Sequence, residues 1–139
     1  AMGIKGGKID KRNTGTWTVE RIYEQFPSLK ARQNQKGSHL SGGEQQMLAI
    51  GRSLMGNPEL IMVDEPTEGL APIVVKEVRD MLEDIHRTGV AILMVEHNLK
   101  VAMSLADRIY LMGKACLVFT GTVDELYAQP EIREKYLEV

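Results

Sequence analysis

Two adjacent carboxylates, Asp64 and Glu65, directly follow the apolar run LIMV at residues 60–63. A single acid after a buried strand is usually a solvated turn residue, whereas two adjacent acids can each perform a different chemical task. The first carboxylate could hold Mg²⁺, which takes few protein ligands and keeps its waters. The second could orient or deprotonate an attacking water. His97 follows another apolar run, at 90–95, and could donate a hydrogen bond to a phosphate, although a lone histidine is more often structural.

A third set of residues, Ser-Gly-Gly-Glu, opens a run with helical periodicity. Ser41 as the N-cap and Glu44 three residues later have the spacing of a capping box, and alone this favours a capped helix and nothing more. Gly42 and Gly43 also leave the first turn without side chains, where free N–H groups and the positive end of the helix dipole lie. Such a bare helix start can accept phosphate oxygens. Together with the paired acids and the histidine, it fits phosphoryl transfer.

The apolar periodicity predicts the elements that must position these groups. Helices are expected at 19–26, 42–55, 73–87, 99–105, 122–129 and from Pro130, and strands at 60–63, 90–95, 109–112 and 117–120. This alternation predicts an α/β fold with a mainly parallel sheet flanked by helices. In such sheets the ligand crevice lies beyond the carboxyl ends of the strands, which is where the paired acids and the histidine stand.

The composition is that of an ordinary globular domain. The chain has 139 residues and a net charge of -2, so no charge excess points to nucleic acid or an anionic membrane as a partner. Its one cysteine, Cys116, excludes an internal disulfide and is expected to be a small buried hydrophobe. The eight methionines are expected to fill the core. Residues 1–17 are rich in Gly and Lys and show no helix or strand period, which predicts a loop or a flexible arm.

In their order and spacing, these motifs resemble the C-terminal part of an ABC-transporter ATPase subunit. LSGGE at 40–44 matches the signature motif of that family, LIMVDEPT at 60–67 its Walker B strand with the catalytic glutamate, and VEH at 95–97 its switch histidine. The resemblance covers most of 18–139. The stretches DEPTEGLAP and PEIREKYLEV are similar to subunits of branched-chain amino-acid or urea importers.

The resemblance implies that an intact parent protein hydrolyses ATP with Mg²⁺ to drive solute transport. Asp64 would hold the Mg²⁺ ion through water, Glu65 would be the general base, and His97 would contact the γ-phosphate. The parent would lie on the cytoplasmic side of the cell membrane, attached to its inner face through transmembrane permease subunits.

The resemblance further implies a second ATPase subunit, arranged head to tail with the first. Ser41, Gly42, Gly43 and Glu44 would then face the ATP held by that other subunit. Ala71 stands where many members of the family carry an aspartate in the D-loop, so coupling across the dimer through that side chain is in doubt. Nothing in the resemblance implies a nucleic-acid partner.

One expected motif is absent from the sequence. A P-loop reads G-x-x-x-x-G-K-[ST], and neither Gly7-Lys8 nor Gly113-Lys114 has this spacing or a following Ser or Thr. The fold is therefore expected to be a partial P-loop NTPase type without the Walker A strand. We predict that the isolated chain has no appreciable ATPase activity. We also expect the missing strand to leave unpaired sheet edges, which favour self-association.

Three segments follow from this interpretation. Residues 1–17 are the arm, 18–56 a remnant of the helical subdomain with the signature helix, and 57–139 a remnant of the α/β core. Two other readings remain: a soluble ABC-type ATPase of DNA repair or translation, and a short binding protein without catalysis. The lack of heptad runs argues against the repair relatives, and EGLAP argues against the translation relatives.

Overall fold

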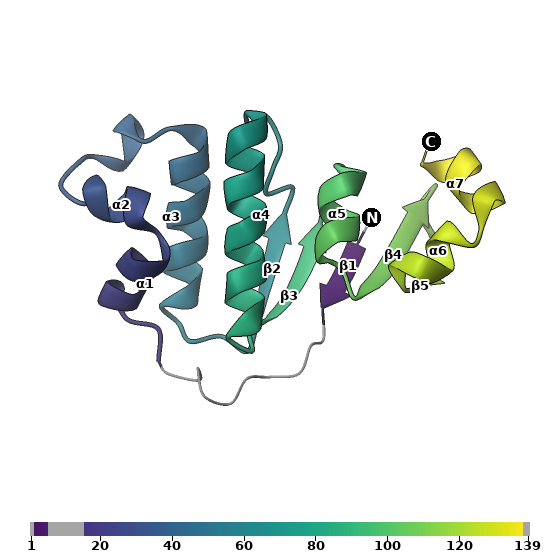
Figure 1. The fold of residues 1–139 in the computed structure, drawn as a ribbon, viewed down its shortest axis with the longest axis horizontal. Helices are drawn as coiled ribbons and strands as arrows, with labels where there is room; N and C mark the ends of the chain where they lie inside the picture. The colour runs from purple at the N-terminus through teal and green to yellow at the C-terminus, as the bar shows by residue number, and fades with distance from the viewer. Residues whose placement is uncertain (1, 6–15, 138–139) are drawn as a thin grey trace.

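The computed structural model describes residues 2–5 and 16–137. In this part of the chain the strands form one five-stranded sheet in the order β2-β3-β1-β4-β5 (Figure 1). The strands are β1 (Met2–Lys5), β2 (Leu60–Asp64), β3 (Ala91–Val95), β4 (Arg108–Gly113) and β5 (Cys116–Gly121). The α-helices are α1 (Val19–Gln25), α2 (Pro27–Ala31), α3 (Gly42–Leu54), α4 (Pro72–Arg87), α5 (Leu99–Leu105), α6 (Val123–Tyr127) and α7 (Pro130–Tyr136).

Local signals in the sequence account for the bounds of these elements, and the helices and strands expected from the periodicity are confirmed. Helix α4, for example, begins at Pro72, a favoured residue for the first helical position. It ends before Gly89, which adopts a φ of 97°, a left-handed conformation that stops a helix at little cost for glycine. The turn between β4 and β5 has positive φ at both Lys114 and Ala115, as in the hairpin turns whose twist matches that of the strands.

The fold class is confirmed as a partial α/β fold, but the pairing of the sheet differs from the expectation. Strands β2 and β3 are parallel, with Leu60 opposite Ala91 and Asp64 opposite Val95. The other three pairings are antiparallel: β1 with β3, β1 with β4, and β4 with β5. The short hairpin forces the last of these, since a two-residue turn can join only antiparallel strands.

Strand β1 corrects the expectation of an arm without structure at the start of the chain. Residues Met2–Lys5 lie between β3 and β4 and pair with both. Backbone N–H and C=O groups left unpaired at such a gap are costly, and a short extended segment satisfies them even though its four residues are too few to predict a strand. The edges expected to be open beside the absent strand are therefore paired. Residues 1 and 6–15 of the expected arm lie outside the described residues.

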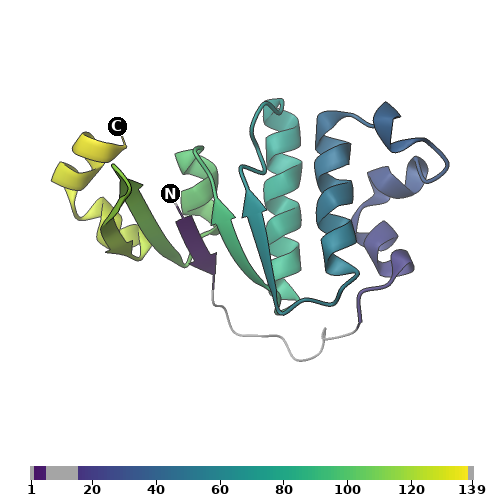
Figure 2. The same cartoon turned by 180° about the vertical axis from the view of Figure 1, so that it is seen from behind.

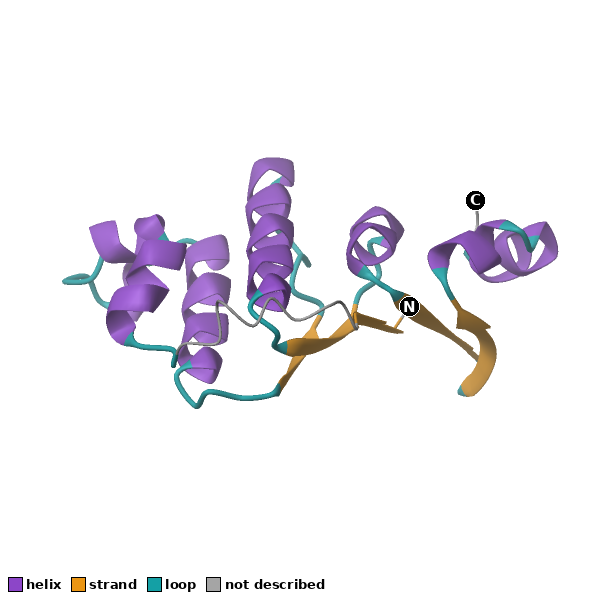
Figure 3. Cartoon of the chain, turned by 60° about the horizontal axis from the view of Figure 1, so that its bottom comes forward, coloured by secondary structure: helices purple, strands orange, loops and turns teal. Residues whose placement is uncertain are grey.

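All the helices lie on one face of the sheet, as the views from behind and from below show (Figures 2 and 3). In β2 the side chains of Ile61 and Val63 are buried, whereas Leu60 and Met62 alternate with them and are 49% and 75% exposed. Among the described residues nothing covers this second face. The described helices include none long and apolar enough to cross a membrane.

Two clusters of buried side chains form the core. The larger joins α1, α3, β2, α4, β3 and α5, and the smaller lies between β4, β5, α6 and the C-terminal residues. Cys116 belongs to neither: it is exposed, because it opens β5 beside the hairpin turn, and the expectation of a buried cysteine was wrong.

Candidate functional site

The paired acids and the histidine meet at one edge of the sheet. Because Asp64 is opposite Val95 in the parallel pair β2–β3, the residues that follow the two strands leave the sheet side by side. His97 Nε2 lies 2.7 Å from Glu65 Oε1. The side chain of His97 is 80% exposed and that of Glu65 is 29% exposed, so solvent or a ligand can reach both. Two groups 32 positions apart in sequence thus form one polar contact.

The backbone at Glu65 is in an unusual conformation. Its φ is 45°, in the left-handed region that side chains other than glycine seldom adopt. The Glu65 N–H donates a hydrogen bond of 2.8 Å to the carbonyl of Val95, which ties this residue to the end of β3. Such strain persists only where the surroundings hold it, and it is often found where a side chain must be aimed at a ligand.

A third carboxylate belongs to the same edge. The pKa of Glu68 is raised above its ordinary value because a hydrogen bond with Glu65 favours its protonated form and the Glu65 charge repels its ionised form, while His97 acts in the opposite direction. Asp64 is exposed at the end of β2. Within the described residues no three metal-binding side chains gather around a common point. A Mg²⁺ ion held here by Asp64 through water would take its remaining ligands from outside the described side chains, which suits an ion that keeps several waters.

The start of α3 is a complete capping box, as the sequence predicted. Ser41 Oγ accepts a hydrogen bond of 3.4 Å from the Glu44 N–H, and Glu44 Oε2 accepts from both the N–H and the hydroxyl of Ser41, each at 2.8 Å. These hydrogen bonds lower the pKa of Glu44, and the one from the Ser41 backbone N–H contributes most. Arg32 pairs with the other carboxylate oxygen of Glu44. The Glu44 side chain is therefore occupied by local structure.

The two glycines of this helix start differ in their surroundings. A Cβ atom on Gly43 would lie 2.1 Å from Val74 Cγ1 on α4, whereas a Cβ on Gly42 would lie 3.4 Å from Leu70 Cδ2. Helix α3 begins at the end of the molecule where β2 and β3 finish (Figures 1 and 2). The absence of a side chain at Gly43 thus has a packing reason that needs no ligand.

Sequence reasoning did not single out Glu96 as a functional group, yet it is 2% exposed. Its Oε2 accepts a hydrogen bond of 2.7 Å from the Thr67 hydroxyl, and its Oε1 accepts one of 2.8 Å from the Asn98 N–H. The signal that could have found it is the alternation along β3. Ile92 and Met94 point inward, and position 96 continues this series.

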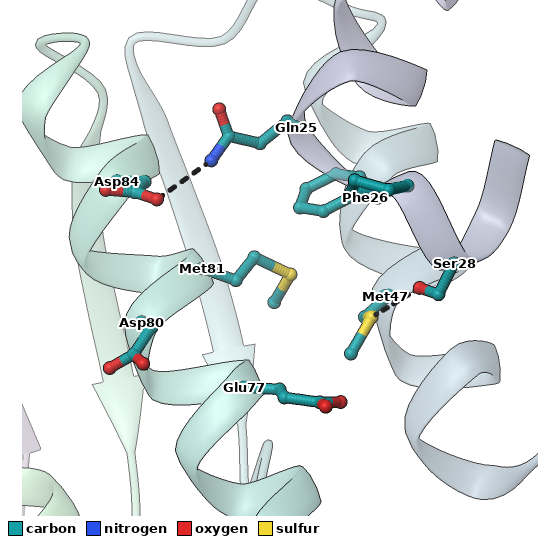
Figure 4. A pocket seen from close by; sticks show the side chains of 9 residues that line it. Gln25, Phe26, Ser28, Met47, Glu77, Asp80, Met81 and Asp84 are labelled. Carbon is teal, nitrogen blue, oxygen red and sulfur yellow. Dashed lines mark hydrogen bonds between the residues drawn. The ribbon is translucent and has the colours of Figure 1, made fainter.

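A groove lies between α1, α2 and α3 on one side and α4 on the other (Figure 4). Its volume is about 350 Å³, and the side chains of Phe26, Met47 and Met81 form its apolar part. Gln25 Nε2 donates a hydrogen bond of 3.0 Å to Asp84 across it. Met47, Met81 and Met94 are buried, as expected of methionines that fill a core, but Met55, Met62 and Met112 are 41%, 75% and 57% exposed, so the expectation was wrong for these three. None of the residues that line this groove belongs to the candidate site. We therefore interpret the groove as part of the interface at which α1, α2 and α3 pack on α4.

Comparisons with known proteins agree with these motifs. The family model "ABC transporter" matches residues 8–68. The chain is 40% identical over 132 residues to the high-affinity branched-chain amino acid transport ATP-binding protein BraG of Pseudomonas aeruginosa, a match covering 95% of this chain and 57% of that protein. It is 30% identical over 119 residues to the lipopolysaccharide export system ATP-binding protein LptB of Haemophilus influenzae, covering 86% and 49%. The chain thus spans about half the length of the curated relatives it matches.

Solved structures show the same likeness. The ADP conformation of MJ1267, an ATP-binding cassette of an ABC transporter, is 28% identical with a TM-score of 0.70, covering 86% of this chain and 49% of that one. A nucleotide-free ATP-binding cassette from an ABC transporter is 27% identical with a TM-score of 0.71, covering 85% and 49%. Motif order, sequence identity and fold point to one conclusion: the chain belongs to the ATP-binding protein family of ABC transporters.

Proposed function

We propose that this chain is part of an importer ATPase subunit whose intact form couples MgATP binding and hydrolysis to solute transport. The observation that carries the proposal is the 2.7 Å contact between Glu65 and His97 at the carboxyl ends of the two parallel strands. The similarity to BraG and the stretch DEPTEGLAP favour branched-chain amino acids or urea as the transported class. We also propose that 18–56 and 57–139 are the remnants of the helical subdomain and of the α/β core.

The proposed roles follow from the chemistry of each group. Glu65 is the general base: its carboxylate is reachable from solvent, and its contact with His97 restricts its orientation. His97 donates to the γ-phosphate from the neighbouring loop. Asp64 holds Mg²⁺ through water, and that ion, when bound, neutralises charge on the phosphate oxygens. Binding, orienting and accepting a proton are thus divided among three side chains.

The start of α3 is the proposed contact with the ATP of a second subunit. The carboxylate of Glu44 is occupied by Ser41 and Arg32, so the groups left for phosphate are the N–H groups of Gly42 and Gly43. The Ser41 hydroxyl now donates to Glu44 and would have to turn away from it to donate to a phosphate. Glu44 would then act through Ser41.

The partners proposed for the intact protein are a second ATPase subunit in a head-to-tail dimer and transmembrane permease subunits on the inner face of the cell membrane. Its cofactors are ATP and Mg²⁺. The names of the relatives, which are ATP-binding proteins of transport systems, support this assembly. For this chain alone we propose no appreciable hydrolysis, since its sequence contains no Walker A motif. We also propose self-association, since β2 is an edge strand of the described sheet and carries the exposed side chains of Leu60 and Met62.

The experiment compares ATP hydrolysis by the natural polypeptide that contains this chain with hydrolysis by its Glu65→Gln variant. Losing a general base should lower the rate about 100-fold or more while ATP binding persists. Glu77→Gln on α4 is the matched control and should hydrolyse at the wild-type rate. Hydrolysis by the natural polypeptide that survives Glu65→Gln would contradict the role of this residue. Robust turnover by the isolated chain, abolished by Glu65→Gln, would contradict its predicted inactivity.

A further inference from the structure

One buried carboxylate connects the two turns that carry Glu65 and His97. Thr67, in the turn after β2, donates its hydroxyl to Glu96 Oε2 at 2.7 Å. Asn98, in the turn after β3, donates its N–H to Glu96 Oε1 at 2.8 Å. Glu96 is 2% exposed and Thr67 is 6% exposed. The two turns are thus joined through a buried carboxylate, whose bond to Thr67 is buried and whose bond to Asn98 is partly buried.

Burying a carboxylate at this position is expensive unless its oxygens are hydrogen-bonded. The side chain occupies the inward series of β3 after Ile92 and Met94, where an apolar residue would pack at no such cost. Hydrogen bonds to a charged acceptor are roughly twice as strong as neutral ones, and they fix direction as well as distance. The carboxylate at Glu96 therefore gives this edge of the sheet a defined geometry that an apolar side chain could not provide.

Neither member of the Glu65–His97 contact is held in place by packing alone. The side chain of His97 is 80% exposed, and the backbone of Glu65 is in the left-handed region. His97 lies between Glu96 and Asn98, so the bond from the Asn98 N–H closes a short ring around it. Thr67 is two residues after Glu65, so its bond to Glu96 restrains the turn in which Glu65 lies.

We propose that Glu96 is a positioning residue that, through Thr67 and Asn98, sets the separation between Glu65 and His97. Its effect on hydrolysis rests on the function proposed above, but its effect on the contact does not. The two can be tested apart, since the contact is measurable in the isolated chain without ATP.

The test uses Thr67→Val, which keeps the shape of the side chain and removes the donor. Hydrogen exchange at the Asn98 amide should speed up about fivefold, the factor that corresponds to losing one typical hydrogen bond. Glu65→Gln should change the ring ¹⁵N chemical shifts of His97 in the otherwise unmodified chain. In the Thr67→Val background that change should be largely lost. Thr67→Ser, which restores the hydroxyl, should recover both signals.

Thr88→Val is the matched control, because the Thr88 hydroxyl donates at 2.6 Å to the Ile85 carbonyl at the far end of α4. It should leave Asn98 and His97 unchanged. If Thr67→Val alone does not fold, adding Glu96→Gln removes the buried carboxylate that has lost the Thr67 donor and allows the same measurements. An unchanged His97 response in Thr67→Val, or in the double variant, would overturn the proposal.

In the natural polypeptide, Thr67→Val should lower kcat with little change in the KM for ATP, and Thr67→Ser should restore kcat. An unchanged kcat beside altered His97 signals would refute only the catalytic consequence. A natural polypeptide without ATPase activity would refute the function proposed above and leave the positioning role of Glu96 standing.

Discussion

Val74 Cγ1 on α4 lies 2.1 Å from the point where a Cβ atom on Gly43 would stand. The backbone of the first turn of α3 therefore lies directly against the side chain of Val74 on α4. The neighbouring glycine has more room, since a Cβ on Gly42 would lie 3.4 Å from Leu70 Cδ2. Of the two glycines in the signature motif, one is needed for packing, and the other remains a glycine for which the fold gives no strong reason.

Gly43→Ala should destabilise the chain, and Gly42→Ala should not. Crowding against Val74, whose β-branched side chain has few rotamers, should cost about 1–3 kcal/mol. The better helix propensity of alanine offsets up to about 1 kcal/mol of that at either position. Urea denaturation of both variants measures the difference in the free energy of unfolding. Equal effects at the two positions would show that Val74 moves aside.

Ser41→Ala should lower the free energy of unfolding by about 1 kcal/mol, the typical value of an N-cap. The loss has a clear origin, because Ser41 accepts from the Glu44 N–H and donates to the Glu44 carboxylate. Ser53→Ala is the matched control: the Ser53 hydroxyl donates to the Ala49 carbonyl on the exposed side of the same helix. Thermal or urea unfolding should show a change within about 0.5 kcal/mol for this control.

The same hydrogen bonds give the effect of Ser41→Ala a pH dependence. They lower the pKa of Glu44 from its ordinary value of 4.5. The stabilisation is thus fully present above pH 4.5 and is lost as the pH falls through the lowered folded-state value. Urea unfolding of the wild type and of Ser41→Ala should therefore show a difference in the free energy of unfolding that is smaller at acidic pH than at neutral pH. A difference independent of pH would mean that the Glu44 charge is not involved.

The elements of the fold were predictable because their signals are local. Caps such as Ser41, the proline that opens α4 and the apolar runs of β2 and β3 all lie within the segments they define. Strand β1 was not predictable in this way. Met2 and Ile4 alternate with Gly3 and Lys5, but four residues are too few to predict a strand, and their conformation depends on unpaired groups of β3 and β4 about a hundred residues away in sequence.

The candidate site also combines features that the sequence predicts with features that it does not. That Glu65 and His97 lie close together follows from parallel strands whose carboxyl ends share an edge. The alternation along β3 places position 96 on the inward face, but this pattern alone does not predict a buried glutamate, since glutamate is rarely buried without partners. One of its partners, Thr67, is 29 positions away. Only the folded chain shows that the two residues meet.

Glu68→Gln should stabilise the chain at neutral pH. The pKa of Glu68 is raised from its ordinary value of 4.5 by its hydrogen bond with Glu65 and by the repulsion between the two carboxylates. A raised acid contributes stability that is fully present below pH 4.5 and is lost as the pH rises through the folded-state value. Above its folded-state value the Glu68 carboxylate is ionised and is repelled by the charge of Glu65, and the substitution removes this repulsion.

Urea unfolding at a series of pH values tests this sign. The advantage of Glu68→Gln over the wild type should be largest at neutral pH and should shrink or reverse below pH 4.5. Glu59→Gln is the control, because Glu59 is an exposed acid just before β2 and takes no part in the Glu65–Glu68 interaction. A Glu68→Gln advantage that grows in acid would contradict the coupling with Glu65.

Met62→Lys should weaken self-association of the chain. Met62 is 75% exposed on the uncovered face of the sheet, beside Leu60, and β2 is an edge strand of the described sheet. An exposed apolar edge strand readily pairs with another chain, and a lysine there opposes it. Light scattering over a wide concentration range should show a mass that rises for the wild type and rises less for Met62→Lys.

Ile73→Lys is the matched control, because Ile73 is 66% exposed but lies on α4, away from the bare face. A wild-type chain that stays monomeric would contradict the prediction. An equal effect of Ile73→Lys would mean that general surface charge, and not the sheet face, controls association.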